Sequence, residues 1–351
     1  MKKERQKRSK SSPALPLPKK AAASIRDVPL EAGQKQAPKE LARVLQKTLQ
    51  NVGPDIAADI SRVFAPLKKR FSAQLQSGSI ADAFTRFNEI ETSIMNGNPT
   101  FKATVPILLE RTAAQRPELI ASGVLIRILD RTFLLTAAHA TDHQNEGTLL
   151  IPGRSGFMAV NGNFSAMRLP LSGRRADDKL DVAYFWLDDH CVSSLDSRCV
   201  VLERPDVCLE AEPAIRTTYT FAGFPWRKSK ISGQSVETDF NTFSGLEAKR
   251  SEYEELGLTR SRHIVIRFHR KRTFSSRYKK VVVSPLPSGM SGGGVYVWNE
   301  EAMKAWPIRL PLAGIATDFV SDKSLLIATR LYVFVRCIFH NQPDLAAIAS
   351  G

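Results

Sequence analysis

Apolar residues recur at helical spacing in the segment 38–98. A typical stretch places them three or four positions apart, at Leu41, Val44, Leu45 and Leu49. Because this spacing puts the apolar side chains on one face, the segment is predicted to form two or three amphipathic helices. Their apolar faces must be buried on the rest of the chain, on each other or on a partner chain, and we expect internal packing.

After Pro99 the pattern changes to short runs rich in Val, Ile, Phe and Tyr, separated by Gly, Pro, Asn and Ser. The runs expected to form strands are 123–129, 132–137, 182–187, 217–221, 263–268, 281–283, 294–297 and 325–329. Many short strands without helices between them indicate an antiparallel barrel or sandwich. The length of 351 residues allows two compact domains, or one large domain with an extension.

Residues 1–37 lack apolar periodicity and are rich in Lys, Ser, Pro and Ala, which predicts a disordered tail. Eleven Lys and Arg against four acidic residues give residues 1–40 a net charge of +7, nearly half of the +15 of the whole chain. A basic tail can contact nucleic acid or an acidic membrane surface, but we favour a solubilising extension.

Export and membrane signals are not expected. Prolines and lysines interrupt the N-terminal region where a signal peptide would be apolar, and no run approaches the roughly 18 apolar residues of a membrane span. A cytoplasmic location is therefore predicted.

The spacing of the four cysteines, Cys191, Cys199, Cys208 and Cys337, matches no zinc pattern. Structural thiols are the favoured interpretation, because a disulfide between neighbouring members of the first three would need an oxidising compartment. No metal and no other cofactor is predicted.

Two segments carry an imidazole and a carboxylate at strand ends. In the segment 136–139 (T-A-A-H), two small residues and then His139 follow an apolar run. Asp181 opens the apolar run 182–187, and a carboxylate held against an imidazole fixes its neutral tautomer and stabilises the imidazolium. Asp177 and Asp178 are competing acids, although neither immediately precedes the apolar run.

A third segment, 288–294 (S-G-M-S-G-G-G), is rich in glycine, which frees the backbone for positive φ. Such a turn can point the N–H groups of Gly289 and Ser291 at one spot, as in an oxyanion hole. The hydroxyl of Ser291 would then lie beside a carbonyl bound there.

Together the three segments resemble the trypsin-like serine peptidases of the chymotrypsin fold, and a bacterial-type member in particular. T-A-A-H, D-V-A and G-x-S-G-G occur in that family's order, with His139 and Asp181 separated by 42 residues and Asp181 and Ser291 by 110. The segment 312–316 (L-A-G-I-A) is similar to the strand that lines the family's substrate cleft, and 221–225 (F-A-G-F-P) to a turn near the start of the second barrel. The resemblance covers roughly residues 100–342.

The resemblance implies a mainly β protein with two antiparallel β-barrels, about 99–205 and 212–340, in a peptidase domain 99–345. It also implies a serine endopeptidase that acts on a protein or peptide. Ser291 would be the nucleophile, His139 the general base and Asp181 the residue that orients it, with an oxyanion hole of the Gly289 and Ser291 amides. The substrate cleft would be lined by Ala316, Thr317 and Asp318.

Two positions depart from the secreted digestive enzymes of this family. Met290 stands where they carry the Asp that pairs with a new N-terminus, and no I-V-G-G-like segment precedes Val124. Activation by cleavage is therefore not expected. Pro285, six residues before the nucleophile, argues against an acidic floor of the specificity pocket; Asp318 and Asp322 can supply negative charge, although solvation is the role we expect.

Two rival functions stay open. One is a catalytically silent protease fold that serves as a binding module. The other is a nucleic-acid-associated protein that uses the tail and the segment 262–280, which holds eight Lys and Arg, aromatic residues and no acid. A strand–turn–strand with solvated basic side chains is the favoured interpretation of that segment. The sequence does not indicate the oligomeric state.

Overall fold

The computed structural model describes residues 98–350 except 112–115, 212–216, 227–229, 233–234, 238–239, 269, 271–272, 276–279 and 300–308. The predicted tail 1–37 and all but the last residue of the predicted helical segment 38–98 lie outside the described residues. The predicted domain boundaries stay predictions.

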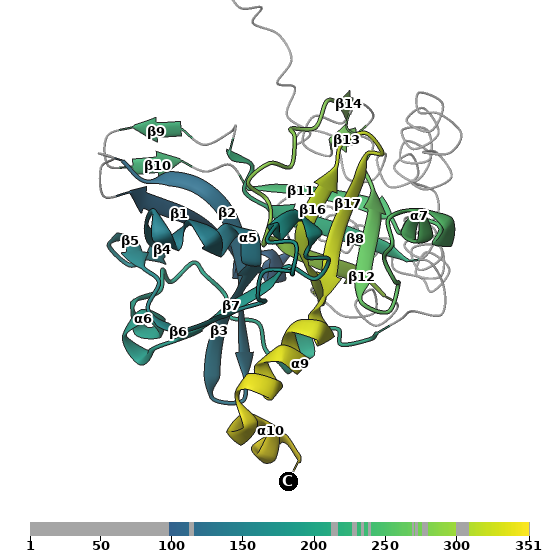
Figure 1. The fold of residues 1–351 in the computed structure, drawn as a ribbon. Coiled ribbons are helices and arrows are strands. Elements are labelled where there is room, and N and C mark those ends of the chain that lie inside the picture. Colours follow the sequence, from purple (N-terminus) through teal and green to yellow (C-terminus); the bar gives the residue numbers. More distant parts are fainter. Residues whose placement is uncertain are drawn as a thin grey trace, which may run out of the picture. The chain divides into compact units, whose positions relative to one another are not determined.

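Seven strands form the first antiparallel sheet, in the spatial order β5-β4-β1-β2-β3-β7-β6 (Figure 1). They are β1 (Thr104–Arg111), β2 (Glu118–Ile128), β3 (Arg131–Ala137), β4 (Gly147–Gly153), β5 (Gly156–Ala159), β6 (Gly162–Ala166) and β7 (Val182–Leu187). In β3, Phe133 and Leu135 join one apolar cluster while Leu134 joins another. Successive side chains of a strand point to opposite faces, so this central strand is covered on both sides.

Six strands form the second antiparallel sheet, in the order β11-β8-β15-β16-β17-β12. They are β8 (Thr218–Gly223), β11 (Asn241–Leu246), β12 (His263–Arg267), β15 (Gly294–Trp298), β16 (Leu312–Val320) and β17 (Leu325–Arg330). Two small hairpins add β9 (Lys230–Ser232) with β10 (Ser235–Glu237), and β13 (Thr273–Ser275) with β14 (Lys280–Val282). The prediction of a mainly β fold built on two antiparallel sheets is confirmed.

Helices are short and few among the described residues: α5 (Ala138–Thr141), α6 (Asp189–Ser194), α7 (Arg250–Glu255), α9 (Leu331–Asn341) and α10 (Pro343–Ser350), with single 3-10 turns between strands. None of them is long and apolar enough to cross a membrane. No disulfide joins the four cysteines, which all lie within the described residues.

A cluster of apolar residues joins the two sheets. It contains Phe133 and Tyr184 from the first sheet and Tyr296 and Ile315 from the second, all at most 2% exposed. Burying each side chain of this size contributes about 1.5–3 kcal/mol. The Tyr296 hydroxyl lies 2.9 Å from Thr104 Oγ1, so a polar contact also fastens β15 to β1.

The helix α9 adds to the contact between the two sheets. It follows directly after β17 of the second sheet and packs Phe334 and Ile338 into the same apolar cluster. At its end Asn341 donates a hydrogen bond of 2.9 Å to the hydroxyl of Tyr184 in the first sheet. Just beyond, Gln342 and Asp344 bind Arg131, whose guanidinium lies 4.0 Å from the centre of a Trp186 ring.

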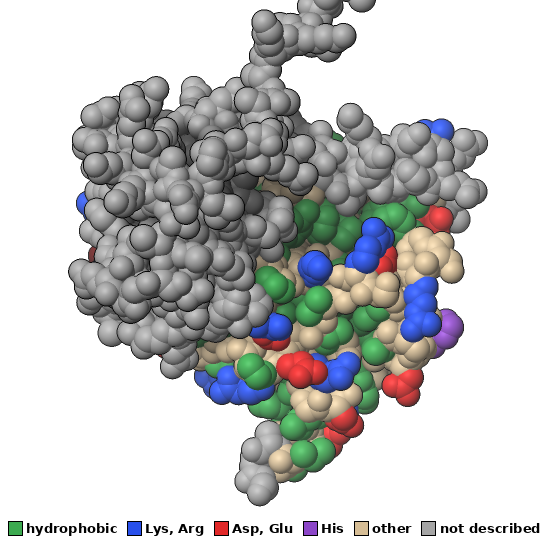
Figure 2. Space-filling view, turned by 180° about the vertical axis from the view of Figure 1, so that it is seen from behind, with side chains coloured by type: hydrophobic (Ala, Val, Ile, Leu, Met, Phe, Trp, Pro, Cys, Tyr) green, Lys and Arg blue, Asp and Glu red, His purple; other side chains and the backbone are tan. Residues whose placement is uncertain are grey.

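Acidic and basic side chains are interspersed on the coloured part of the surface in Figure 2.

Candidate active site

His139 projects from the end of a central strand. β3 ends at Ala137, which pairs with Val182 of β7, and α5 begins at Ala138. Both alanines are fully buried, and the N–H of Ala138 donates to the carbonyl of Asp181 at 2.9 Å. Small side chains at these two positions therefore let the backbone of the His139 turn approach the start of β7.

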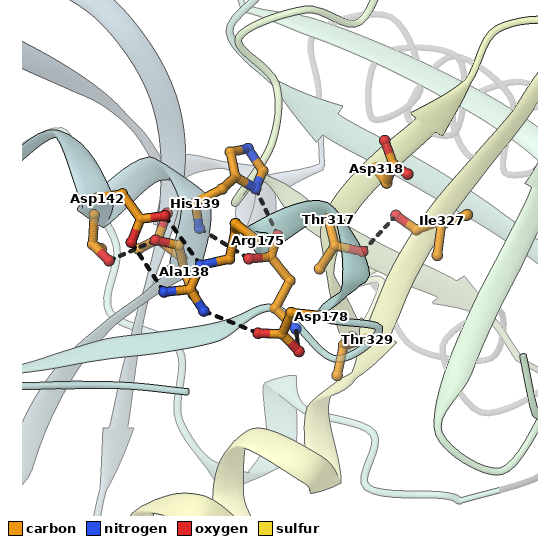
Figure 3. Close-up of polar contacts among 12 residues, drawn as sticks. Ala138, His139, Asp142, Arg175, Asp178, Thr317, Asp318, Ile327 and Thr329 are labelled. Carbon is orange, nitrogen blue, oxygen red and sulfur yellow. Dashed lines mark hydrogen bonds and ion pairs between the residues drawn. The ribbon is translucent and has the colours of Figure 1, made fainter. Parts of the chain in front are cut away.

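The carboxylate of Asp181 makes two hydrogen-bond contacts with His139. Asp181 Oδ2 lies 2.6 Å from His139 Nδ1, and Asp181 Oδ1 accepts a hydrogen bond of 2.9 Å from the His139 backbone N–H (Figure 3). A carboxylate only accepts, so Nδ1 carries the hydrogen and the lone pair is left on Nε2. The Asp181 side chain is 8% exposed and the His139 side chain 39%, which places a buried acid behind an accessible imidazole.

The pKa of His139 reflects these neighbours. Burial lowers the pKa, but the hydrogen bond and the charge of Asp181, together with the charges of Asp318 and Asp142, outweigh it and raise the pKa above its ordinary value. The surroundings thus stabilise the imidazolium that forms when His139 takes up a proton.

Asp178, the main competitor for the role of Asp181, builds the turn behind it. Its Oδ1 accepts hydrogen bonds from the backbone N–H groups of Leu180 (3.1 Å) and Asp181 (3.0 Å), and its Oδ2 lies 3.1 Å from a guanidinium nitrogen of Arg175. Asp177 pairs with Arg174 at 2.9 Å. Of the three acids, Asp181 is the one in contact with His139.

The segment around Ser291 forms two successive tight turns. Met290 N–H donates to the Pro287 carbonyl and Gly293 N–H to the Met290 carbonyl, both at 2.9 Å. The third residues of these turns, Gly289 and Gly292, have φ of +88° and +81°. Positive φ at this position defines a type II turn and requires glycine. A Cβ on Gly292 would also lie 2.0 Å from the Ser122 carbonyl oxygen.

These turns fix the direction of two backbone N–H groups. The Ser288 carbonyl accepts a hydrogen bond of 3.0 Å from Trp226 N–H, and the Met290 carbonyl accepts the bond from Gly293. In a trans peptide the N–H points opposite to the C=O, so the N–H groups of Gly289 and Ser291 point away from these anchors. Within the described part of the chain, neither donates a hydrogen bond to a protein acceptor.

The serine turn is docked on the first sheet beside His139. The N–H of Ser122 in β2 donates to the Ser291 carbonyl at 2.8 Å, and Thr136, three residues before His139, donates through Oγ1 to the Ser122 carbonyl at 2.8 Å. In the described structure the Ser291 hydroxyl makes no hydrogen bond to the His139 ring. In unliganded enzymes, contacts between nucleophile and base are often long and tighten when substrate binds.

Ser122 contacts the candidate site at a position that sequence patterns did not reveal. Its side chain is fully buried, accepts from Phe224 N–H at 3.0 Å and donates to the Gly289 carbonyl at 3.3 Å. A serine inside an apolar strand gives no signal of this role, because both partners lie more than 100 positions away along the chain.

The three residues predicted to line the substrate cleft lie in β16. Ala316 exchanges backbone hydrogen bonds with Gly292 (2.7 Å) and Gly293 (2.8 Å), which ties β16 to the serine turn. Thr317 is an extra residue opposite β17, because the register shifts between Ala316 and Asp318. Such a bulge re-aims the side chains that follow. Asp318 is exposed, and its charge contributes to the raised pKa of His139.

Behind the serine turn, Met290 is 4% exposed and belongs to the apolar cluster of the second sheet. It lines a small pocket, whose other walls are Phe221, Asn241, Thr242, Phe243, Phe268, Ser284, Pro285 and Pro287. The apolar side chain of Met290 is stable in these buried surroundings, whereas a carboxylate at this position would need a charged partner.

Within the basic segment 262–280, the described contacts are intramolecular. The guanidinium of Arg267 lies 2.9 Å from Glu252, and Arg270 Nε donates to the Ser284 carbonyl at 3.1 Å. Residues 269, 271–272 and 276–279 of the segment lie outside the described residues, and the nucleic-acid alternative stays a prediction.

No protein-family model and no curated protein matches the sequence. Among solved structures, the chain is similar to a mutant of human heparin binding protein (16% identity, TM-score 0.44, covering 70% of this chain and 95% of that one). It is also similar to neuropsin, a serine protease of mouse brain (11%, 0.43, 70% and 96%), and to the serine protease domain of the Sesbania mosaic virus polyprotein (13%, 0.38, 66% and 89%). These are distant similarities that assign no activity to this chain, and the bacterial-type qualifier stays a prediction.

Proposed function

We propose that this protein is a serine endopeptidase that hydrolyses peptide bonds through an acyl-enzyme. The observation that carries the proposal is the two-point contact of the Asp181 carboxylate with the ring and the backbone of His139. A surface His–Asp ion pair needs only one contact, whereas this geometry fixes both the tautomer and the orientation of an accessible ring.

In the proposed acylation step, Ser291 Oγ attacks the carbonyl carbon of the scissile bond while its proton moves to His139 Nε2. Asp181 stabilises the resulting imidazolium. The negative oxygen of the tetrahedral intermediate lies against the N–H groups of Gly289 and Ser291, each worth about 2.7–4 kcal/mol in such a hole. When the C–N bond breaks, His139 returns the proton to the leaving amine.

Deacylation repeats the sequence with water. His139 removes a proton from the water as it attacks the ester carbonyl, the same two N–H groups hold the oxyanion, and the proton passes to Ser291 Oγ as the ester bond breaks. The carboxylic acid product then leaves the site.

The strand β16 supports an extended peptide as substrate. Its pairing with β15 ends at Ile315, and, among the described residues, 317–320 make no backbone–backbone hydrogen bond on that side; the Phe319 N–H donates to Oδ1 of the neighbouring Asp318 at 2.7 Å. An open strand edge beside the nucleophile can pair with an extended peptide through main-chain hydrogen bonds.

A fluorophosphonate probe tests the proposal, because it reacts only with an activated serine. We expect wild-type protein to be labelled and to hydrolyse a peptide library, and Ser291→Ala to do neither. Ser288→Ala is the matched control, since this exposed serine lies in the same turn. Folded wild-type protein that is neither labelled nor active would favour the silent binding module instead.

A further inference from the structure

The loop that carries Asp181 is held by the second sheet at two consecutive carbonyl groups. Thr329 Oγ1 donates to the Leu180 carbonyl at 2.6 Å, and His263 Nε2 lies 3.1 Å from the Lys179 carbonyl oxygen. Because a carbonyl only accepts, Nε2 of His263 carries the hydrogen in this contact. Lys179 and Leu180 are therefore bound to the second sheet, although the strand that follows Asp181, β7, belongs to the first sheet.

His263 and Thr329 form a donor pair that is built into the second sheet. They are direct partners in the antiparallel register of β12 and β17, so their side chains lie side by side on one face. They are 4% and 0% exposed. Nδ1 of His263 faces the backbone of Thr259, with its carbonyl at 3.1 Å and its N–H at 3.3 Å, which fixes the ring.

Asp181 needs such support because its backbone is strained. Its φ of +49° lies in the left-handed region, which costs a residue with a Cβ on the order of 1–2 kcal/mol. Conformations of this kind persist only when the surroundings over-determine them. Asp178 holds the N–H of Asp181, Ala138 holds its carbonyl, and the donor pair holds the two preceding carbonyls.

We propose that His263 and Thr329 are positioning residues for Asp181. The second sheet then supplies the nucleophile and also sets where the carboxylate meets His139, although neither positioning residue touches His139. The catalytic consequence rests on the proposed function. A displacement of a reacting group by about 1 Å can lower a rate by about 100-fold, so the reaction is sensitive to this contact.

The test compares Thr329→Val, which keeps the shape and removes the hydroxyl, with Thr329→Ser, which keeps the hydroxyl. For Thr329→Val we expect a fall of roughly 3- to 10-fold in kcat/KM and an acid limb of the pH profile displaced to lower pH, because a loosened carboxylate stabilises the imidazolium less. Thr329→Ser should restore both. Thr217→Val, which removes a hydroxyl bond of 3.1 Å to the Trp298 carbonyl in the same sheet, is the control and should keep the wild-type pH profile.

His263 gives a second comparison if Thr329→Val does not fold. His263→Phe removes the donor and should behave like Thr329→Val, whereas His263→Gln retains an N–H group and should lie nearer to the wild type. An acid limb that stays in place in both Thr329→Val and His263→Phe would overturn the proposal, and so would an activity loss that only follows the fall in melting temperature.

Proton NMR separates this proposal from the proposed function. The hydrogen between His139 Nδ1 and Asp181 gives a low-field signal whether or not the protein hydrolyses peptides. We expect this signal to shift or broaden in Thr329→Val and to be unchanged in Thr217→Val. If wild-type protein proves inactive, the endopeptidase proposal fails, and an unchanged signal in Thr329→Val then overturns the positioning role as well.

Discussion

The backbone N–H of Ser122 donates a hydrogen bond of 2.8 Å to the carbonyl of Ser291. Ser122 belongs to the first sheet and Ser291 to a turn that is tied to the second. The contact places the candidate nucleophile against the strand pair from which His139 projects. The active geometry therefore depends on how closely two backbones approach, and this dependence can be tested at a glycine.

Gly292→Ala is expected to abolish fluorophosphonate labelling. The added Cβ would lie 2.0 Å from the Ser122 carbonyl oxygen and 2.3 Å from Thr136 Oγ1, so the turn cannot keep its place. Gly257→Ala is the matched control, because Gly257 also has positive φ (+64°) but open space around its Cβ position. We expect this control to lower the free energy of unfolding by about 1 kcal/mol and to keep its labelling. Equal labelling of both variants would contradict the docking of the turn.

Asp181→Asn is expected to lower kcat by about 10⁴-fold while the protein stays folded. The amide oxygen of the new side chain can still accept the His139 backbone N–H, which turns its NH₂ group towards Nδ1. Nδ1 must then accept, so the hydrogen moves to Nε2 and the ring can no longer act as a base.

Asp178→Asn provides the comparison for this experiment. An Asn at position 178 can still accept from the N–H groups of Leu180 and Asp181, and it loses only the charge that faces Arg175. We expect less than a ten-fold effect on kcat. A larger loss in Asp178→Asn than in Asp181→Asn would show that the acids have been assigned in the wrong order.

Asp318→Asn is expected to move the acid limb of the kcat/KM profile to lower pH. The charge of Asp318 raises the pKa of His139, so its removal lowers that pKa and keeps the neutral base available in more acidic solution. Asp322→Asn, in the exposed turn after β16, is the control and should leave the limb in place. A shift to higher pH in Asp318→Asn would contradict the placement of this carboxylate.

Cys199 is expected to resist alkylation in the folded protein. Burial raises the pKa of its thiol to about 11, so at pH 8 roughly one molecule in a thousand carries the reactive thiolate. Mass spectrometry after brief treatment with iodoacetamide should find this cysteine unmodified in native protein and modified in denaturant. Rapid modification in the native state would show that the site around Cys199 is open.

The sequence singled out His139 and Ser291 as candidates because each lies in a short segment whose neighbouring residues favour the same local geometry. The alanines before His139 are buried where the backbone comes close to β7, and the glycines beside Ser291 occupy positions with positive φ. In such segments the residues that shape the backbone lie next to the candidate residue in the sequence, so a short sequence pattern is enough to single it out.

The sequence favoured Asp181 over Asp178 only through its position directly before the strand, because both acids precede the same apolar run. Their roles differ only in what each carboxylate faces: backbone N–H groups for Asp178, an imidazole for Asp181. The roles of Ser122, His263 and Thr329 were invisible for a related reason. Each acts on a residue at least 84 positions away, across the joint between the sheets.

The predicted strands did not include β1, β5 or β6. Most residues of β5 and β6 are partly or fully exposed, and β1 contains Pro106, which weakens a strand signal. The helix α9 was missed because its buried residues directly follow the apolar strand β17, and the two apolar patterns merge.

The joint made by α9 also bears on the order of events during synthesis. Translation delivers the first sheet and then the second, but Phe334, Ile338 and Asn341, which fasten one to the other, emerge later than every strand of both. A nascent chain that still lacks them carries all three candidate catalytic side chains but only part of the apolar cluster that joins the two sheets. The contact between the two halves is therefore completed only after the last strand has been synthesised.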